Sequence, residues 1–262
     1  MPVSDGFHET AAVVTGASSG IGQAIAIALA QAGASKLVVH YCNNQAGAEQ
    51  TAAAVQSAGT DALVVAADLR IASDRERLVE TSFDCLGQVQ TWVNNAGADV
   101  LTGETASLDF DAKLRRLLDV DLAGTVALSR LVAERLLKQD LGHPASMVFI
   151  GWDQAPQGME GDAGQMFGPV KAAVMAFSAS LAQTLAPSVR VNTVAPGWIQ
   201  TSWGESTSQY WSDRAQHQSL MQRWGYPGDV ATAVLFAADP ANSFLTGQTI
   251  DVNGGWNRRY RQ

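Results

Sequence analysis

A glycine-rich turn near the N-terminus contains the residues whose types and spacing could bind a nucleotide. Residues 15–22 read Thr-Gly-Ala-Ser-Ser-Gly-Ile-Gly, so the glycines follow the spacing G-x-x-x-G-x-G. Gly16 allows a sharp turn, Gly20 lets a ligand approach the backbone, and Gly22 lets a following helix lie close to a sheet. The chemistry that such a turn supports is the binding of a pyrophosphate by backbone N–H groups. A plain tight turn between buried elements is the alternative.

The elements around this turn support the nucleotide interpretation. The apolar run at 11–14 predicts a strand, and the alanine-rich segment at 23–32 predicts a helix. A strand, a glycine turn and a helix in that order direct N–H groups and the positive end of the helix at one point, where an anion binds.

The same alternation continues along the chain. Near-continuous apolar strands that alternate with helices predict a parallel sheet covered on both faces, and therefore one doubly wound α/β domain over residues 1–262. Further strands are expected at 36–41, 62–66, 91–93, 147–150 and 189–194, and further helices at 45–57, 73–85, 108–138 and 170–186. Ser73 to Glu76 has the pattern of a capping box, and Pro169 is expected in the first turn of its helix.

Residues 200–224 break the alternation. This segment is polar and aromatic by turns, and three of the seven tryptophans lie in it, at Trp203, Trp211 and Trp224. A segment of this kind after the carboxyl end of a strand is where α/β enzymes place a substrate lid. An ordinary pair of packed surface helices explains the pattern equally well.

Composition excludes several classes of function. The net charge of −8 is unfavourable for nucleic-acid binding, and the basic residues are scattered apart from Arg258, Arg259 and Arg261. Cys42 and Cys85 are the only cysteines and have neither metal-binding nor disulfide spacing. There is no apolar run of membrane-spanning length and no signal-peptide pattern. We therefore expect a cytoplasmic protein without a metal, a nucleic-acid partner or a membrane segment.

Four later motifs extend the pattern of the glycine turn. They are Asn94-Asn95-Ala96-Gly97, Val-Asn-Thr-Val-Ala-Pro-Gly at 191–197, Arg-Trp-Gly-Tyr-Pro-Gly-Asp-Val-Ala at 223–231, and Leu-Thr-Gly-Gln-Thr-Ile-Asp-Val-Asn-Gly-Gly at 245–255. With them, the chain resembles the short-chain dehydrogenase/reductase family over essentially its full length. Within that family it is most similar to 3-oxoacyl-[acyl-carrier-protein] reductases. The resemblance implies a single Rossmann-type domain with a seven-stranded parallel sheet.

The resemblance also implies a set of cofactor-binding residues. In the family these positions line the pyrophosphate, the adenosine, the ribose side and the nicotinamide carboxamide, and a lysine holds the nicotinamide ribose. Here they are Gly16, Ser18, Ser19, Gly20, Ile21, Gly22, Asp68, Leu69, Asn95, Ala96, Gly97, Lys171, Pro196, Gly197, Ile199 and Thr201. Asn94 is expected to be structural, because in the family it ties neighbouring strands together.

The choice between NAD(H) and NADP(H) is read at the end of the second strand. An acid there would bind the ribose 2′-hydroxyl of NAD and repel the 2′-phosphate of NADP. Tyr41 occupies that position, and Asn43 and Asn44 follow, with no acid before Glu49 and no arginine or lysine nearby in sequence. The glycine turn carries Ser19 where many NADP-dependent relatives have a basic residue. We expect NADP(H) to be favoured over NAD(H).

The catalytic positions implied by the resemblance are largely replaced. Lys171 is retained, but Phe167 stands at the tyrosine that donates the proton, Trp152 at the serine that holds the substrate oxygen, and Asp121 at the asparagine that anchors a water relay. Phenylalanine has no ionisable proton, so the family's proton transfer cannot occur in the usual way. In the enoyl-reductase variant of the family the tyrosine lies seven residues before the lysine. That position is Gly164 here, so this arrangement is absent too.

Three hypotheses for function follow from these replacements. The favoured one is an NADP(H)-binding homologue, acting as a sensor or partner subunit, that lacks tyrosine-dependent carbonyl reduction. The alternative is an active NADP-dependent oxidoreductase with a non-standard proton donor; a purely structural module is less favoured because the cofactor motifs are so complete. The segment that borders the site contains Asp153, Gln154, Glu160, Asp162 and Gln165, and none of them is assigned a catalytic role because polar loops are usually solvated.

Two structural expectations complete the sequence analysis. A buried ammonium is unfavourable without a partner, so Asp121 and Lys171 are expected to form an ion pair, with Phe167 and Trp152 over the nicotinamide. The alternative is that Asp121 points away. The helices predicted at 108–138 and 170–186 carry apolar residues on more than one face, so one of those faces needs cover. In the family these two helices pair with their copies across a two-fold axis, and the resemblance therefore implies a homodimer or homotetramer. The apolar residues of the two helices are Leu117, Leu118, Leu122, Val126, Val174, Met175, Phe177 and Leu181.

Overall fold

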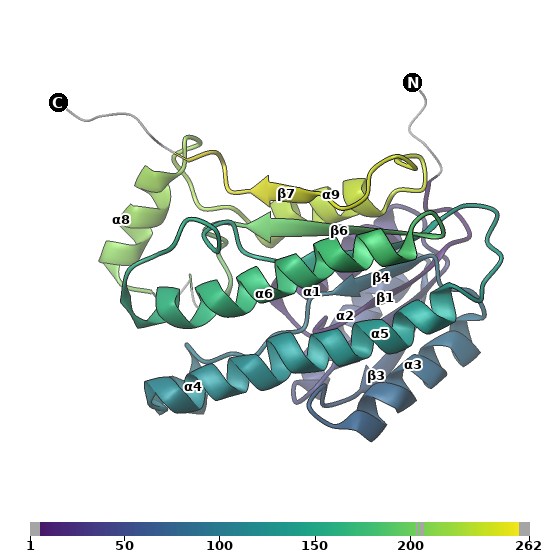
Figure 1. The fold of residues 1–262 in the computed structure, drawn as a ribbon, viewed down its shortest axis with the longest axis horizontal. Coiled ribbons are helices and arrows are strands. Elements are labelled where there is room, and N and C mark those ends of the chain that lie inside the picture. The colour runs from purple at the N-terminus through teal and green to yellow at the C-terminus, as the bar shows by residue number, and fades with distance from the viewer. Residues whose placement is uncertain (1–5, 203, 205–206, 257–262) are drawn as a thin grey trace.

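Seven parallel strands form the centre of the molecule. The computed structural model describes residues 6–202, 204 and 207–256. The sheet has the order β3-β2-β1-β4-β5-β6-β7, and every neighbouring pair is parallel, which confirms the predicted doubly wound sheet (Figure 1). The strands are β1 (Ala11–Val14), β2 (Lys36–Tyr41), β3 (Asp61–Ala66), β4 (Thr91–Asn94), β5 (Ala145–Ile150), β6 (Val189–Pro196) and β7 (Thr249–Val252). The strand order reverses between β1 and β4, so a crevice opens there at the carboxyl ends of the strands.

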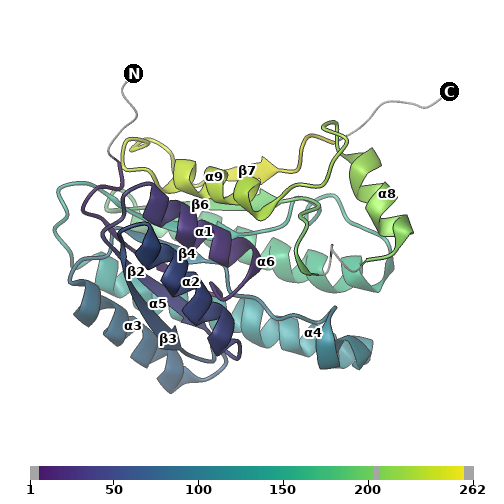
Figure 2. The same ribbon diagram turned by 180° about the vertical axis from the view of Figure 1, so that it is seen from behind.

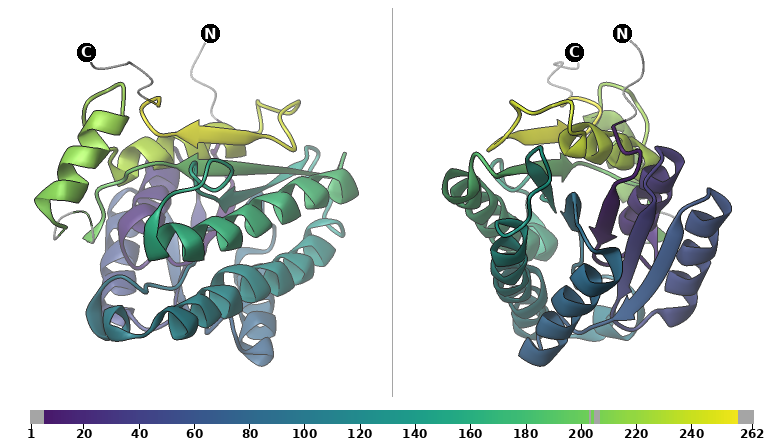
Figure 3. Two further views of the ribbon diagram at one scale, coloured as in Figure 1. Left: turned by 60° about the vertical axis from the view of Figure 1, so that its left-hand side comes forward. Right: turned by 90° about the vertical axis from the view of Figure 1, so that its right-hand side faces the viewer.

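Helices cover both faces of this sheet. One layer holds α1 (Gly20–Gln31), α2 (Gln45–Ser57) and α9 (Pro227–Ala238), and it lies in front in Figure 2. The opposite layer holds α3 (Ala72–Leu86), α4 (Phe110–Leu117), α5 (Thr125–Leu136) and α6 (Gly161–Leu185), and Figure 3 shows the two layers on either side of the strands. None of the helices in the described part of the chain is long and apolar enough to cross a bilayer.

Burial on both faces explains the near-continuous apolar strands. Every residue of β1, β4, β5 and β6 is buried. One apolar cluster between the sheet and α3, α5 and α6 contains Trp92 and Phe149, and the other, beneath α1 and α9, contains Ile25 and Leu29. The sheet is therefore a rigid platform whose strand ends can position a site.

Two predictions about helix starts are wrong, the capping box at Ser73–Glu76 and the place of Pro169 in the first turn of its helix. Helix α3 begins at Ala72 and has no side-chain cap; the Asp74 carboxylate accepts a hydrogen bond from the Asp68 N–H at 2.8 Å instead of completing a capping box. Helix α6 begins at Gly161, so Pro169 lies inside it rather than in its first turn. The missing proline N–H is tolerated because Met166 and Val170 are buried on either side of it and hold the helix in place.

The predicted long helix at 108–138 is also interrupted. A short 3₁₀ helix, η1 (Gly103–Ser107), precedes it, and the Asp109 side chain caps α4 by accepting from the Ala112 N–H at 2.8 Å. A π-helical stretch, η2 (Leu118–Gly124), then joins α4 to α5 and contains Asp121. Such stretches are frequent at functional sites, where they redirect one side chain.

The segment 200–224 contains one described helix, α8 (Gln209–Gln218). Residues 203 and 205–206 of this predicted lid lie outside the described residues, as do Arg258, Arg259 and Arg261. The predicted tryptophans Trp211 and Trp224 are described, and Trp203 is not.

Candidate functional site

The glycine turn is packed so closely at Gly16 and Gly22 that a side chain at either position would displace its neighbours. Gly16 has a φ of +62°, and a Cβ there would lie 2.7 Å from the Ala96 Cα. A Cβ on Gly22 would overlap the Gly16 carbonyl oxygen and the Asn95 side-chain nitrogen. These contacts match the roles predicted for Gly16 and Gly22, because both positions need close backbone approach.

The N-terminus of α1 leaves space for an anion. Its N-cap residue, Ser19, makes no side-chain capping hydrogen bond within the described residues. A Cβ added to Gly20 would meet only the Thr201 Cγ2, at 3.7 Å. The first N–H groups of a twelve-residue helix therefore face an open cradle between Gly20 and Thr201, and this cradle fits the pyrophosphate of a dinucleotide.

Hydrogen bonds from β4 hold the turn in place. The Asn95 side-chain N–H donates to the carbonyl oxygens of Thr15 at 2.9 Å and Gly16 at 3.0 Å. The Thr15 hydroxyl oxygen accepts from the backbone N–H groups of Asn95 and Ala96. Asn94 was expected to tie neighbouring strands together, but its Oδ1 accepts from the Ser129 hydroxyl in α5 at 3.3 Å, and its Nδ2 is buried without a partner among the described residues.

His40 supports the turn from the side of β2. The Gly16 N–H donates to its Nδ1 at 3.1 Å, which places the proton on Nε2, 3.0 Å from the Ala67 carbonyl oxygen. Burial lowers the pKa of His40 to about 4, and the Ala67 carbonyl opposes this effect. The imidazole is therefore neutral at physiological pH, and it connects the glycine turn to the end of β3.

The predicted cofactor-specificity residues lie at the carboxyl end of β2. Tyr41 is half-buried and Asn43 is exposed, while Asn44 caps α2 by accepting from the Gly47 N–H at 3.0 Å. At the neighbouring end of β3, the Asp68 carboxylate is bound by the Arg70 guanidinium, whose Nε donates to both carboxylate oxygens at 3.0 Å. Leu69 beside it is buried.

Two basic residues near this end of the crevice were missed from the sequence. Desolvation raises the pKa of the Cys42 thiol and Asp68 adds to the effect, whereas Arg70 and Arg116 lower it. Arg70 is paired with the Asp68 carboxylate, and Asp74 also raises the pKa of Cys42, so charges of both signs act on the residue that follows Tyr41. Arg70 is in the β3–α3 connection and Arg116 is in α4, so no local spacing in the sequence places them here.

Asp121 and Lys171 form the predicted ion pair. The Lys171 Nζ lies 3.1 Å from the Asp121 Oδ2, and the side chains are 15% and 2% exposed. The other carboxylate oxygen accepts from the Ala98 N–H at 2.7 Å. A Cβ on Gly97 would lie 2.8 Å from this carboxylate, so Asp121 is held directly beneath the Asn95–Ala98 segment. The alternative, in which Asp121 points away, is wrong.

Trp152 and Phe167 lie together above this ion pair. Their ring centroids are 6.5 Å apart with an edge-to-face interplanar angle of 68°. With Lys171 they line a cavity of about 470 Å³. The predicted residues Ile21, Asn95, Pro196, Gly197, Ile199 and Thr201 line the same cavity, with Leu101, Ile150, Gly151, Met159, Ala163, Trp198, Trp211 and Trp224.

The polar segment after β5 is only partly solvated. Glu160, Asp162 and Gln165 are exposed as expected, but Asp153 and Gln154 are 3% and 1% exposed. Burial raises the pKa of Asp153 to about 6, against a hydrogen bond of 3.1 Å from the Asn253 side-chain N–H. Asp153 lies under Gly197 and is not among the described residues that line the cavity.

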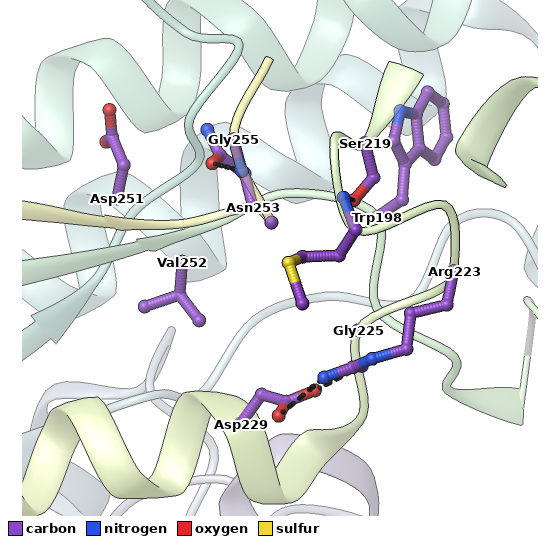
Figure 4. A pocket seen from close by; sticks show the side chains of 11 residues that line it. Trp198, Ser219, Arg223, Gly225, Asp229, Asp251, Val252, Asn253 and Gly255 are labelled. Carbon is purple, nitrogen blue, oxygen red and sulfur yellow. Dashed lines mark hydrogen bonds and ion pairs between the residues drawn. The ribbon is translucent and has the colours of Figure 1, made fainter. Parts of the chain in front are cut away.

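A second cavity of about 290 Å³ lies on the other side of Trp198 (Figure 4). The Arg223–Asp229 ion pair of 2.8 Å borders this cavity. Asp251 and Asn253 also line it at the end of β7, and Figure 4 shows the Asp251 carboxylate pointing away from the ion pair. Desolvation raises the pKa of Asp251. This second cavity is therefore charged, whereas the cavity beside Lys171 is mostly apolar.

The carboxyl ends of the strands thus bring the retained and the replaced family positions into one crevice. The glycine turn, Asn95 and the 196–201 segment surround one part of it, and Asp121, Trp152, Phe167 and Lys171 surround another. Trp198 was not identified as a site residue from the sequence, although it directly follows the motif at 191–197. Its neighbours in space come from α8 and from residue 224, which are distant in the sequence.

Comparisons with known proteins agree with this site. The family model described as enoyl-(acyl carrier protein) reductase matches residues 16–257. A 3-oxoacyl-[acyl-carrier-protein] reductase from Synechocystis is 34% identical over 93% of this chain and 95% of its own.

Two solved structures have the same architecture. A 7α-hydroxysteroid dehydrogenase in complex with NADH and a bile acid, 7-oxo-glycochenodeoxycholic acid, has a TM-score of 0.86 at 29% identity and covers 100% of both chains. A short-chain dehydrogenase from Burkholderia cenocepacia in complex with NADP has a TM-score of 0.84 at 26% identity, over 95% of this chain and 98% of that one. With the parallel sheet and the glycine turn, these matches show that the chain belongs to the short-chain dehydrogenase/reductase family.

Proposed function

We propose that the protein binds NADP(H) and does not carry out the tyrosine-dependent carbonyl reduction of its family. The observation that supports this proposal is that a complete glycine turn occurs together with Trp152 and Phe167, two aromatic side chains in contact that carry no hydroxyl group. A nicotinamide cofactor would supply a hydride, but reduction of a ketone also requires a proton at the new oxygen. Neither of these two side chains can donate one from an ionisable group.

The residues present account for binding without that step. The N–H groups at the start of α1 would hold the pyrophosphate, and Lys171 would contact the nicotinamide ribose. Because Asp121 already neutralises Lys171, the ammonium does not need a tyrosine hydroxyl beside it. Asp153 has the raised pKa of an acid that could donate a proton, but its place beneath Gly197 keeps it from the cavity. The oxidoreductase with a substitute donor is therefore the less favoured function.

The preference for NADP(H) rests on the end of β2. The position of the expected acid is Tyr41, so no carboxylate at that residue would repel a 2′-phosphate. A calorimetric titration should give NADPH a Kd at least a few-fold lower than that of NADH. Equal or reversed affinities would contradict this preference, and no binding of either would overturn the proposed function.

A substrate panel tests the loss of catalysis. With NADPH and simple ketones, diketones and acyl thioesters, the unmodified protein should show no reduction above background. Phe167→Tyr alone should remain inactive, because Trp152 still fills the position of the substrate-binding serine. The control is the triple variant Phe167→Tyr/Trp152→Ser/Asp121→Asn, which restores the family's side chains and should gain measurable turnover. Robust reduction by the unmodified protein would contradict the proposal.

We also propose a cytoplasmic homo-oligomer, a dimer or a tetramer. Both cysteines are free thiols, which agrees with a reducing compartment. Fewer of the apolar helix residues are available for assembly than the sequence indicated. Leu118 is 39% exposed, whereas Leu117, Val174 and Leu181 are buried within the chain itself. Light scattering at micromolar concentration should give a multiple of the chain mass, and a monomer would refute the assembly.

A further inference from the structure

The charge around Lys171 differs from the charge that the family's motif implies. An asparagine at position 121 would leave the Lys171 ammonium without a compensating charge, whereas Asp121 lies 3.1 Å from it here. Among the described residues that line the cavity beside it, Lys171 is the one ionisable side chain. The charge at this end of the crevice is therefore set by Lys171 and by carboxylates that are buried behind the cavity wall.

The two redox forms of the predicted cofactor differ in charge at the nicotinamide ring. The ring of NADP⁺ is positively charged, and the ring of NADPH is neutral, whereas the phosphates are the same in both. We propose that Asp121 and Asp153 together make this site select NADP⁺ over NADPH. This selection rests on the proposed function, because NADP(H) must occupy the crevice. It suits a sensor, since the bound fraction would follow the ratio of the two forms.

Asp121 is fixed beside the ribose side of the predicted cofactor site. It lies in the π-helical stretch η2, and its Oδ1 accepts from the Ala98 N–H at 2.7 Å. A Cβ on Gly97 would lie 2.8 Å from its Oδ2. The side chain is 2% exposed, so water screens its charge poorly. The electric field of this carboxylate therefore extends through the thin wall formed by residues 95–98.

The first effect of Asp121 is to cancel a repulsion. An unpaired Lys171 ammonium would repel the positively charged ring of NADP⁺ and would have no such interaction with the neutral ring of NADPH. The Asp121 carboxylate attracts the same ring from 3.1 Å behind the ammonium, and the two interactions nearly balance. The pair alone therefore removes a preference for the reduced form.

Asp153 adds a second buried carboxylate behind another part of the cavity wall. Its N–H donates to the Pro196 carbonyl oxygen at 3.1 Å, and a Cβ on Gly197 would lie 3.1 Å from its Oδ2. Pro196 and Gly197 both line the cavity. Oδ2 accepts from the Asn253 side chain, whereas Oδ1 is buried without a partner among the described residues. No ammonium or guanidinium of the described residues is thus bound to Asp153 as Lys171 is to Asp121.

The second carboxylate is charged at mildly alkaline pH. Burial raises the pKa of Asp153 to about 6, Asp251 at the end of β7 adds to the rise, and the Asn253 hydrogen bond opposes it. The group is therefore almost fully ionised at about pH 8. One ammonium and two carboxylates then surround this end of the crevice. The excess negative charge attracts the ring of NADP⁺ and leaves the neutral ring of NADPH unaffected.

Calorimetry with NADP⁺ and NADPH at about pH 8 tests the selection. The Kd of NADP⁺ should be lower than that of NADPH by at least about threefold. High salt should weaken both through the exposed phosphates, but the ratio of the two Kd values should persist because the carboxylates are buried. Equal affinities, or tighter binding of NADPH, would overturn the inference.

Variants that remove one charge identify its source. Asp121→Asn leaves the ammonium unpaired and should shift the ratio of the two affinities toward NADPH by about tenfold. Asp153→Asn should shift it the same way by about threefold, and Lys171→Met should shift it toward NADP⁺. A purely structural role would weaken both redox forms equally and leave the ratio unchanged, which would contradict the selection. The opposite shifts also keep the test decisive if one variant does not fold.

Asp84→Asn is the matched control. It removes one negative charge from a side chain that is 76% exposed, near the end of α3 and at the amino ends of the strands, opposite the crevice. The ratio of the two affinities should not change. Equal shifts in Asp84→Asn and Asp121→Asn would attribute the preference to the net charge of the protein and would contradict a local origin.

The same titrations separate this inference from the proposed function. Failure of both redox forms to bind would refute the proposed function and the selection with it. Binding of both forms with equal Kd values would refute the selection alone and leave the proposed function standing.

Discussion

The glycine turn and the carboxyl end of β5 border the same crevice but are held together by different contacts. In the glycine turn, the Gly16 N–H donates to the His40 Nδ1, the Asn95 side chain donates to the Thr15 carbonyl oxygen, and the Thr15 hydroxyl accepts from the Asn95 N–H. At the end of β5, Trp152 packs edge-to-face on Phe167, and the acid Asp153 is buried beneath.

The difference teaches that cofactor binding and proton transfer have separate physical requirements in this fold. The first needs a backbone shape, which glycines and short side chains supply. The second needs one ionisable group at one point, which a phenyl ring at that point would not supply. Since no hydrogen bond among the described residues joins the two regions, the first can persist when the second has changed.

The largest effect is expected from Gly22→Ala. Its Cβ would overlap the Gly16 carbonyl oxygen and the Asn95 side chain, so the turn or α1 must move. We expect NADPH affinity to fall more than about 100-fold and stability to fall by about 3 kcal/mol. Gly228→Ala is the control, because nothing lies within 4 Å of a Cβ there. NADPH affinity that is unchanged in Gly22→Ala by calorimetry would show that the cradle is elsewhere.

The two regions also differ in how far sequence alone describes them. The order of strand, glycine turn and helix is local in the chain, so the spacing of Gly16, Gly20 and Gly22 was sufficient to predict the turn, whereas its packing against Asn95 and Ala96 involves a distant segment. The sheet followed from periodicity for the same reason. The pairing of Asp121 with Lys171 was predictable because a buried ammonium needs a partner, whichever elements bring it.

Features that depend on distant segments could not be predicted. Trp198 meets Trp211 and Trp224 only because the 200–224 segment folds back over β6. Arg70 and Arg116 approach Cys42 from two other elements. Asp153 lies in a polar stretch, and its burial results from the covering segment around Gly197 and Asn253. Helix α6 begins before Pro169 because tertiary packing outweighs the local preference against an internal proline.

Acid pH should affect the glycine turn through His40. Its pKa is about 4 in the folded protein, below the ordinary value of 6.5, so the unfolded chain binds more protons between these pH values. The contribution of neutral His40 to the free energy of unfolding is therefore fully present above pH 6.5. It is lost as the pH falls to 4, by about 3 kcal/mol in total. In urea titrations, the stability of His40→Gln relative to the unmodified protein should improve by that amount from pH 6.5 to 4. A constant difference would mean that the imidazole is not neutral and buried.

Asp153 should give the opposite dependence at the other region. Its pKa of about 6 is above the ordinary 3.8, so the folded protein binds more protons than the unfolded chain in this range. Its contribution is lost as the pH rises from 3.8 to 6, again by about 3 kcal/mol. Asp153→Asn should therefore become more stable relative to the unmodified protein as the pH rises through this range. If the relative stabilities of His40→Gln and Asp153→Asn changed with pH in the same direction, the two regions would not differ in their response to pH.

A smaller effect is expected from Asp121→Asn. The amide can still accept from the Ala98 N–H, but the charge opposite Lys171 is lost. Because Lys171 is 15% exposed and can be hydrated, we expect a loss of about 1–2 kcal/mol rather than the larger penalty of a fully buried ion. A double-mutant cycle with Lys171→Met, measured by urea unfolding, isolates the pairwise energy. A coupling near zero would show that the ion pair does not stabilise this centre.

The smallest effect is expected on the choice between NADP(H) and NAD(H) at the end of β2. Tyr41→Asp places a carboxylate at the end of β2, where it would repel a 2′-phosphate and accept from a ribose 2′-hydroxyl. At the solvent-exposed rim, two negative charges a few ångströms apart repel each other by about 1 kcal/mol. NADPH affinity should therefore fall several-fold, while NADH affinity is unchanged or rises. Tyr41→Asn is the matched control, since it has the same shape without the charge and should change the NADPH-to-NADH ratio much less. The difference between the two variants should shrink in high salt, because the repulsion is screened. If Tyr41→Asp and Tyr41→Asn shift the ratio equally at low salt, charge at residue 41 does not determine the preference, and the discrimination would have to come from Arg70 and Arg116.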